Sequence, residues 1–171
     1  ILHDWNYRSR IGYMPQIGRY PDNMSIGQVL NMMKDIRKVK SSEMDEELIE
    51  AFELNTMANK RMRTLSGGTR QKVSASLAFL FNPDVLILDE PTAGLDPVAT
   101  EILKRKIIQE KQKNKLIMIT SHVLSELDEL VTEVMYMQDG LCRFHKKVDV
   151  LRTETSEERL TRVMASIISK M

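Results

Sequence analysis

The sequence predicts an α/β fold in which a parallel sheet is covered by helices and interrupted by a helical insertion. Two short apolar runs, residues 85–88 and 116–119, are continuous rather than alternating, which is typical of parallel strands buried on both faces. A helical pattern over residues 98–113 joins them into a strand–helix–strand unit. Residues 21–81 show helical patterns without a strong strand signal, so this stretch is the predicted insertion.

Length and composition fit one globular domain, because 171 residues slightly exceed the roughly 150 of a typical domain. Lysine and arginine total 25 against 24 aspartate and glutamate, and 42% of the residues are hydrophobic, which excludes a disordered tail and argues against a nucleic-acid partner. No apolar run approaches the roughly 18 residues that span a bilayer, so we expect no direct membrane insertion. The lone cysteine, Cys142, cannot pair within the chain, which favours a reducing compartment such as the cytoplasm.

Three serines predict the helix starts in the insertion. Ser25, Ser42 and Ser66 each precede a helical pattern and have the side-chain oxygen that an N-cap needs. The three helices are predicted to reach about residue 39, residue 52 and the residue before Asn82.

A helix, a hairpin and a terminal helix are expected after the second predicted strand. Residues 124–131 have a helical pattern, and residues 134–137 and 141–144 flank Asp139-Gly140, a hairpin turn signal. Residues 156–171 predict a terminal helix with one apolar face. That face carries Leu160, Val163, Met164, Ile167 and Ile168.

Polar residues follow both predicted strands, at the edge of the sheet where ligands bind in parallel α/β folds. Asp89 and Glu90 follow the first strand and residues 120–122 follow the second, so we expect both groups at one crevice. Two adjacent carboxylates suit phosphoryl chemistry, in which the first holds Mg²⁺ and the second positions and deprotonates the attacking water. A strand-end pair that faces solvent is the alternative; Pro91 and residues 93–96 favour the functional interpretation.

The helix start at residues 65–71 is a second candidate phosphate site. Ser66 is followed by Gly67 and Gly68, which let the backbone approach an anion that the helix dipole and unpaired N–H groups favour. A glycine-rich turn that only caps a core helix is the alternative. The position of this helix just ahead of the acidic strand favours the anion site.

Five sequence motifs, given below in chain order, are similar to those of the nucleotide-binding domain of ATP-binding cassette (ABC) proteins, above all the ATPase subunits of transporters. Residues 12–16 (Gly-Tyr-Met-Pro-Gln) resemble the Q-loop, residues 65–71 the signature, and the strand ending at Asp89-Glu90 the Walker B motif. Residues 93–96 (Ala-Gly-Leu-Asp) resemble the D-loop, and His122 the H-loop histidine. The resemblance implies a P-loop NTPase-like core with a largely parallel sheet plus an α-helical subdomain.

The resemblance also implies how this partial domain is divided and which residues act on ATP and Mg²⁺. The helical subdomain would cover about residues 21–82, the core about 83–145 and a helical tail about 146–171. Catalytic roles are implied for Gln16, which would contact Mg²⁺ and the attacking water, for Glu90 as the catalytic glutamate and for His122, which would hydrogen-bond the γ-phosphate. A metal-binding role is implied for Asp89, which would support Mg²⁺.

A head-to-tail dimer is implied as well, with ATP held between two nucleotide-binding domains. Ser66, Gly67 and Gly68 would contact the γ-phosphate of ATP in the opposite subunit, and Asp96 would communicate across the interface. Thr69 replaces the glutamine that is usual at the fifth signature position, which we do not interpret as loss of function. The implied partners are a second nucleotide-binding domain and a transmembrane permease subunit, so the expected location is cytoplasmic, peripheral on the inner face of the cell membrane.

The sequence has no Walker A motif. A P-loop reads Gly-x-x-x-x-Gly-Lys-Ser/Thr, and none of the glycines, at positions 12, 18, 27, 67, 68, 94 and 140, has another glycine five positions later. Trp5 and Tyr7 lie too close to the Q-loop to be the aromatic residue that stacks on adenine. We therefore expect the sequence to begin partway into the domain, and the isolated chain to be inactive.

Two other functions stay open as alternatives. A non-transport cassette ATPase of the ribosome-associated or repair type shares these motifs, although the 50 positions from Gln16 to Ser66 leave no room for the coiled coil of repair members. The other alternative is a non-catalytic, cassette-derived interaction module. The joint presence of Asp89, Glu90 and His122 argues against that module.

Overall fold

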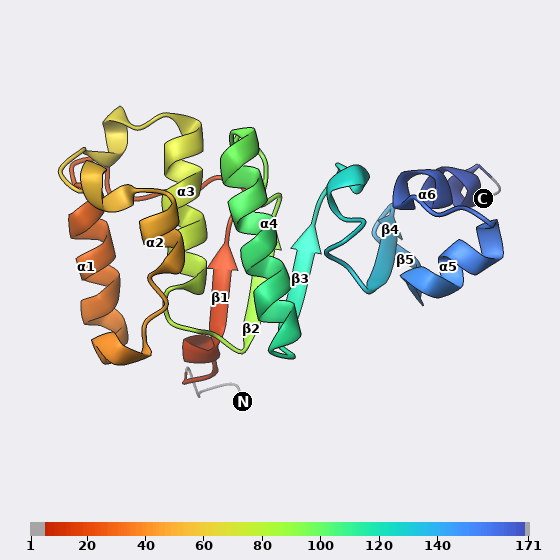
Figure 1. Ribbon diagram of the computed structural model, residues 1–171, viewed down its shortest axis with the longest axis horizontal. Helices are drawn as coiled ribbons and strands as arrows, with labels where there is room; N and C mark the ends of the chain where they lie inside the picture. Colours follow the sequence, from red (N-terminus) through yellow and green to blue (C-terminus); the bar gives the residue numbers. More distant parts are fainter. Residues whose placement is uncertain (1–5, 170–171) are drawn as a thin grey trace. The chain divides into compact units, whose positions relative to one another are not determined.

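The computed structural model describes residues 6–169, which form two compact units, one up to Thr120 and one from Ser121 (Figure 1). Trp5 lies outside the described residues. The first unit consists of parallel strands connected through helices. In chain order its elements are η1 (Asn6–Arg10), β1 (Ile11–Met14), α1 (Ile26–Arg37), η2 (Ser41–Glu43), α2 (Glu47–Ala51), η3 (Leu54–Met57), η4 (Met62–Thr64), α3 (Gly67–Phe79), β2 (Val85–Asp89), α4 (Pro97–Gln112) and β3 (Leu116–Thr120).

The strands of the first unit form a parallel sheet in the order β1-β2-β3. Ile11 pairs with Val85 and Val85 with Leu116, and the register continues toward the carboxyl ends, where Asp89 pairs with Thr120. The two strands predicted from apolar runs are confirmed, and so is the helix between them. β1 did not stand out in the sequence because it has only four residues, one of them Gly12.

Helix α3 packs against one face of this sheet. A Cβ atom added at Gly12 would lie 2.1 Å from the carbonyl oxygen of Ala78, so only glycine lets α3 approach β1 this closely. Met14, Leu86 and Leu88 are fully buried on the same face. The hydrophobic core of the first unit therefore lies between the sheet and its helices.

The opposite face of the sheet is open in the first unit. Tyr13, Leu116 and Met118, which point to that face, are 56%, 66% and 52% exposed. The expectation that residues 116–119 are buried on both faces is therefore wrong for β3. The physical reason is that α3 and α4 cover only the face carrying Leu86 and Leu88, and alternate side chains of a strand point to opposite faces.

Helix α1 begins where Ser25 predicts and ends at Arg37, close to the expected end. Ser25 Oγ accepts a hydrogen bond from the backbone N–H of Gln28, and Gln28 Oε1 accepts one from the N–H of Ser25 at 2.8 Å. This reciprocal capping box satisfies two N–H groups that would otherwise lack helical partners.

The helix predicted after Ser42 is wrong in its extent. Ser41–Glu43 forms a separate 3-10 turn, and α2 covers only Glu47–Ala51. Asp45 interrupts the helix because its backbone N–H donates to the carbonyl oxygen of Leu80 at 2.8 Å, a contact with the end of α3. A tertiary hydrogen bond thus replaces the local one that a continuous helix would have made.

A buried lysine joins α4 to the segment before α2. The Lys106 side chain is only 2% exposed, and its Nζ lies 2.7 Å from Glu47 Oε2, 3.3 Å from Glu110 Oε1 and 2.5 Å from Asp45 Oδ2. Burial lowers the pKa of Lys106, but the hydrogen bonds to Asp45 and Glu47 outweigh burial and leave the pKa raised. Lys106 is therefore charged and held by carboxylates.

Glu110, one turn further along α4, completes this ion network. Its side chain is 1% exposed and pairs with Lys113 at 2.8 Å and Lys115 at 2.5 Å. Burial raises the pKa of Glu110, yet hydrogen bonds from Lys113 and Lys115 and the charge of Lys106 lower it to about 2. The network connects Asp45, just before α2, and Glu47, the first residue of α2, with α4 and with Lys115, the residue before β3.

The second unit is a hairpin followed by two short helices. Its elements are η5 (Leu124–Glu126), β4 (Glu133–Gln138), β5 (Leu141–Lys147), α5 (Val148–Thr155) and α6 (Leu160–Ile168). β4 and β5 are antiparallel, which confirms the predicted hairpin. Asp139 and Gly140 have φ values of 51° and 74°, as the tight turn between two strands requires.

Two helical predictions in the second unit are wrong. Residues 124–131 form only a short 3-10 turn, and here Asp128 Oδ1 accepts the backbone N–H of Leu160 at 2.6 Å, a tertiary contact that the local pattern does not encode. The terminal helix begins at Leu160, not near Ser156, because Ser156 has a left-handed φ of 57° that ends α5. Its predicted apolar face is buried at Leu160, Val163 and Met164.

Among residues 6–169, no helix combines the length and apolar character needed to cross a membrane.

Candidate functional site

The glycine-rich turn at residues 65–68 forms the exposed N-terminus of α3. Ser66 is the N-cap: its Oγ accepts the backbone N–H of Thr69 at 3.2 Å and lies 2.9 Å from the Thr69 hydroxyl oxygen. Ser66 and Gly67 are exposed. The start of a thirteen-residue helix is therefore exposed at Ser66 and Gly67, an arrangement that favours anions.

The two glycines of this turn have different surroundings. A Cβ atom added at Gly67 would meet nothing within 4 Å, so this position leaves open space for a ligand. A Cβ atom added at Gly68 would lie 2.7 Å from the carbonyl oxygen of Gly94. Gly68 is thus required by close packing within the chain, against the loop that follows β2.

Asp89 and Glu90 stand at the carboxyl end of β2, the central strand. Thr120 Oγ1 donates a hydrogen bond to Asp89 Oδ1 at 2.5 Å, and the backbone N–H of Glu90 donates to the carbonyl oxygen of Thr120 at 3.0 Å. Glu90 has a left-handed φ of 48°, which is uncommon for a residue with a side chain. The end of β3 thus fixes both acidic residues, and the backbone turns sharply at the second one.

Gln16 and His122 follow the two outer strands. Gln16 is exposed and lies two residues beyond β1, whose Met14 pairs with Leu88 of β2, so Gln16 and the two acidic residues follow neighbouring strands at the same edge of the sheet. His122 is exposed and lies two residues beyond β3, at the beginning of the second unit. The structure therefore brings Gln16, Asp89 and Glu90 to one sheet edge.

Asp96 is the N-cap of α4, and its Oδ1 accepts the backbone N–H of Ala99 at 2.8 Å. Its Oδ2 accepts a hydrogen bond from Lys72 Nζ on α3 at 2.7 Å, and the two opposite charges form an ion pair. Both interactions lower the pKa of Asp96, with the Lys72 hydrogen bond contributing most. Sequence reasoning missed Lys72; its position one helical turn beyond Gly68 was the available signal.

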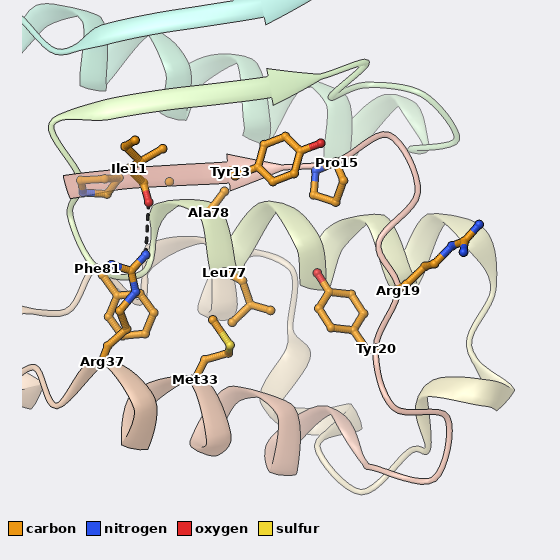
Figure 2. A pocket seen from close by; sticks show the side chains of 12 residues that line it. Ile11, Tyr13, Pro15, Arg19, Tyr20, Met33, Arg37, Leu77, Ala78 and Phe81 are labelled. Carbon is orange, nitrogen blue, oxygen red and sulfur yellow. Dashed lines mark hydrogen bonds between the residues drawn. The ribbon is translucent and has the colours of Figure 1, made fainter. Parts of the chain in front are cut away.

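A cavity of about 290 Å³ lies between β1, α1 and the end of α3 (Figure 2). Arg37 reaches from α1 to the carbonyl oxygen of Ile11, to which its Nη2 donates at 3.2 Å, and its guanidinium lies 5.3 Å from the centre of the Phe81 ring. Tyr20, from the segment after β1, lies between β1 and α1 and also lines the cavity. The walls are thus apolar and aromatic with cationic groups, and no acidic residue is among the described lining residues.

The residues at the sheet edge fit Mg²⁺ bound together with a nucleotide. Asp89, Glu90, Gln16 and Thr120 supply only oxygen donors, the ligands that Mg²⁺ prefers. Within residues 6–169 there is no group of three His, Cys, Asp or Glu side chains that could hold a metal ion by themselves. Protein Mg²⁺ sites commonly use one or two carboxylates, and phosphates and water complete the coordination.

Comparison with known proteins shows which family this sequence matches. The family model described as "ABC transporter" matches residues 2–93. The human phospholipid-transporting ATPase ABCA3 is 35% identical over 136 residues, covering 78% of this chain and 8% of that protein. The ABC transporter ATP-binding protein YhaQ of Bacillus subtilis is 30% identical over 162 residues, covering 92% of this chain and 54% of that protein.

A solved structure described as the ATP-binding subunit of an ABC transporter has the same fold. It superposes with a TM-score of 0.85 at 22% sequence identity, covering 95% of this chain and 70% of that one. The chain spans about half the length of the bacterial relative and less than a tenth of ABCA3. The match of the family model to more than half of the sequence shows that this chain belongs to the ABC transporter family.

Proposed function

We propose that this chain is the signature- and Walker B-bearing part of an ATP-hydrolysing subunit that drives transport through a membrane partner. The observation that carries the proposal is the end of β2, where Thr120 holds the Asp89 carboxylate and the backbone turns at Glu90. Family membership and the transporter names of the relatives support transport as the use of this ATPase.

In the proposed reaction, the residues at the sheet edge orient water and accept its proton. Glu90 is the general base for the water that attacks the γ-phosphate, and Gln16 orients that water and a Mg²⁺ ligand shell. Asp89, oriented by Thr120, supports Mg²⁺, which when bound neutralises charge on the β- and γ-phosphates. His122 hydrogen-bonds the γ-phosphate.

The signature turn and the loop before α4 are proposed to act across a dimer. Ser66 and Gly67 present the open helix N-terminus to the γ-phosphate of ATP held by a second nucleotide-binding domain, while Gly68 sets the backbone position. Asp96 lies at the interface in this proposal. Because no P-loop motif occurs in the sequence, these 171 residues alone are expected to be inactive in ATP hydrolysis.

The cavity between β1, α1 and α3 is the proposed contact with the membrane-embedded subunit, on the cytoplasmic side of the membrane. Pro15, the neighbour of Gln16 in the chain, lines this cavity, so a helix seated there would lie close to the proposed Q-loop residue. Its apolar walls, with Met33 and Phe81, suit the apolar face of such a helix.

Photocrosslinking from position 33 in membranes tests this contact and is expected to capture the membrane subunit. Gln112, a surface position on α4, is the control, and equal capture from both positions would contradict the contact.

Glu90→Gln tests hydrolysis. In the complete gene product, phosphate release from ATP is expected to fall at least about 10²-fold, because the proton acceptor is removed while shape is kept. Glu101→Gln, an exposed glutamate on α4, is the matched control and is expected to keep wild-type turnover. Unchanged turnover in Glu90→Gln would remove Glu90 from the base role.

Nucleotide titration tests the need for an external P-loop. A fluorescent ATP analogue added to the 171-residue chain is expected to show no saturable binding at micromolar concentration, since the sequence contains no P-loop motif. Saturable, Mg²⁺-dependent micromolar binding would show that the chain cradles ATP in another way.

A further inference from the structure

The signature helix and the loop after β2 are joined at two points within the chain. The first is the ion pair between Lys72 Nζ on α3 and Asp96 Oδ2, at 2.7 Å. The second is the close approach of Gly68 to Gly94, where an added Cβ atom would lie 2.7 Å from the Gly94 carbonyl oxygen. Gly68 and Lys72 are four residues apart on one face of α3, so both contacts belong to the same surface of that helix.

Lys72 also interacts with an aromatic ring, that of Phe52. Its ammonium group lies 5.9 Å from the centre of the Phe52 ring, at the end of α2, and its side chain is 23% exposed. A cation over an aromatic face gains electrostatic attraction, and the ring limits the directions in which the lysine can turn. Lys72 is therefore oriented toward Asp96.

Asp96 in turn fixes the loop. One carboxylate oxygen caps α4 through the N–H of Ala99, and the other takes the Lys72 hydrogen bond. Upstream, the N–H of Ala93 donates to the carbonyl oxygen of Glu90 at 3.1 Å, so the loop is also tied to the acidic end of β2. The loop therefore begins with a turn that is hydrogen-bonded to Glu90, the residue that follows Asp89.

We propose that Lys72 is a positioning residue that fixes the loop 91–96 against the start of the signature helix, so that Ser66 and Asp96 act as one rigid surface on the nucleotide of the second subunit. This inference rests on the proposed function. The pair contributes little to folding, because the Asp96 side chain is 51% exposed and solvent screens it. Its effect is on geometry, and small displacements of positioning groups cost large factors in rate.

The test compares Lys72→Ala, Lys72→Arg and the matched control Lys104→Ala in the complete gene product. Lys104 lies on α4, is similarly shielded at 22% exposure and pairs with the exposed Glu101 at 3.5 Å. We expect Lys72→Ala to lower kcat about tenfold or more with little change in KM for ATP, because the P-loop side of the site is untouched. Lys72→Arg, which keeps the charge and the reach to Asp96, is expected to restore most of kcat, and Lys104→Ala to match wild type.

Hydrogen exchange gives a readout besides turnover. Amides of residues 91–99 are expected to exchange faster in Lys72→Ala than in wild type, while the melting temperature stays close to that of wild type. In a double-mutant cycle with Asp96→Asn, the effects on kcat are expected to be non-additive, because both changes remove the same contact.

The outcomes separate this inference from the proposed function. A wild-type protein without ATPase activity would overturn both. Active wild type, inactive Glu90→Gln and full kcat in Lys72→Ala would overturn only the positioning role. A loss of kcat in Lys72→Ala that Lys72→Arg does not restore, or that adds independently to Asp96→Asn, would also overturn it.

Discussion

Thr120, the last residue of β3, donates its hydroxyl hydrogen to the carboxylate of Asp89, the last residue of β2, over 2.5 Å. The two residues are paired in the parallel register, so the hydrogen bond follows from the alignment of the two strands. A carboxylate that is oriented from the neighbouring strand loses less freedom when it meets a cation or a phosphate-bound water shell. Thr120 therefore belongs to the support of the proposed Mg²⁺ site.

Thr120→Val removes this hydrogen bond while keeping the side-chain shape. We expect kcat for ATP in the complete gene product to fall up to about tenfold, which corresponds to one hydrogen bond. Thr120→Ser keeps the hydroxyl and is expected to retain most activity. Equal loss in both variants would show that the methyl group, not the hydroxyl, matters at this position.

Lys106→Met is expected to destabilise the fold by about 3 kcal/mol, because it leaves the carboxylates of Asp45 and Glu110 shielded without their shared cation. Lys113→Met is the control: Lys113 also pairs with Glu110, but its side chain is 53% exposed. Its loss is expected to stay below about 1 kcal/mol. Urea unfolding measures both, and similar losses would contradict a buried network centred on Lys106.

The pH dependence of stability should report Glu110. Its folded pKa of about 2 lies below the ordinary 4.5, so the ionised form is favoured in the native state. The contribution is fully present above the unfolded pKa and is lost as pH falls through the window from about 4.5 to about 2. The difference in unfolding free energy between wild type and Glu110→Gln is therefore expected to shrink across that window. A constant difference would show that Glu110 is not held ionised by its lysines.

The signature glycines should respond differently to alanine. Gly68→Ala is expected to cost about 1–3 kcal/mol of stability, because the new methyl group meets the Gly94 carbonyl oxygen. Gly67→Ala meets nothing within 4 Å and replaces a flexible residue in the first helical turn, so stability should be unchanged or slightly higher. Thermal unfolding of both variants decides this, and a larger loss in Gly67→Ala would reverse the assignment.

Much of the secondary structure could be predicted from local patterns. The apolar runs, the N-cap serines Ser25 and Ser66, and the Asp139-Gly140 turn identified elements that the structure confirms. Patterns failed where tertiary contacts replace local ones: Asp45 bonds to Leu80 and shortens α2, and Asp128 caps Leu160. The length of an apolar run also could not show that only one face of β3 is covered, since coverage depends on which helices pack there.

The sequence by itself determined the family and the candidate chemistry, because the order of glycine, carboxylate and histidine motifs is carried by residue types and spacing alone. Only the tertiary structure decided which groups support that chemistry. Thr120 beside Asp89, Lys72 beside Asp96 and Gly94 against Gly68 are distant in the chain and lie on different elements. The physical reason is that strand register and helix packing, which sum many weak contacts over the whole unit, set these distances to within hydrogen-bonding range.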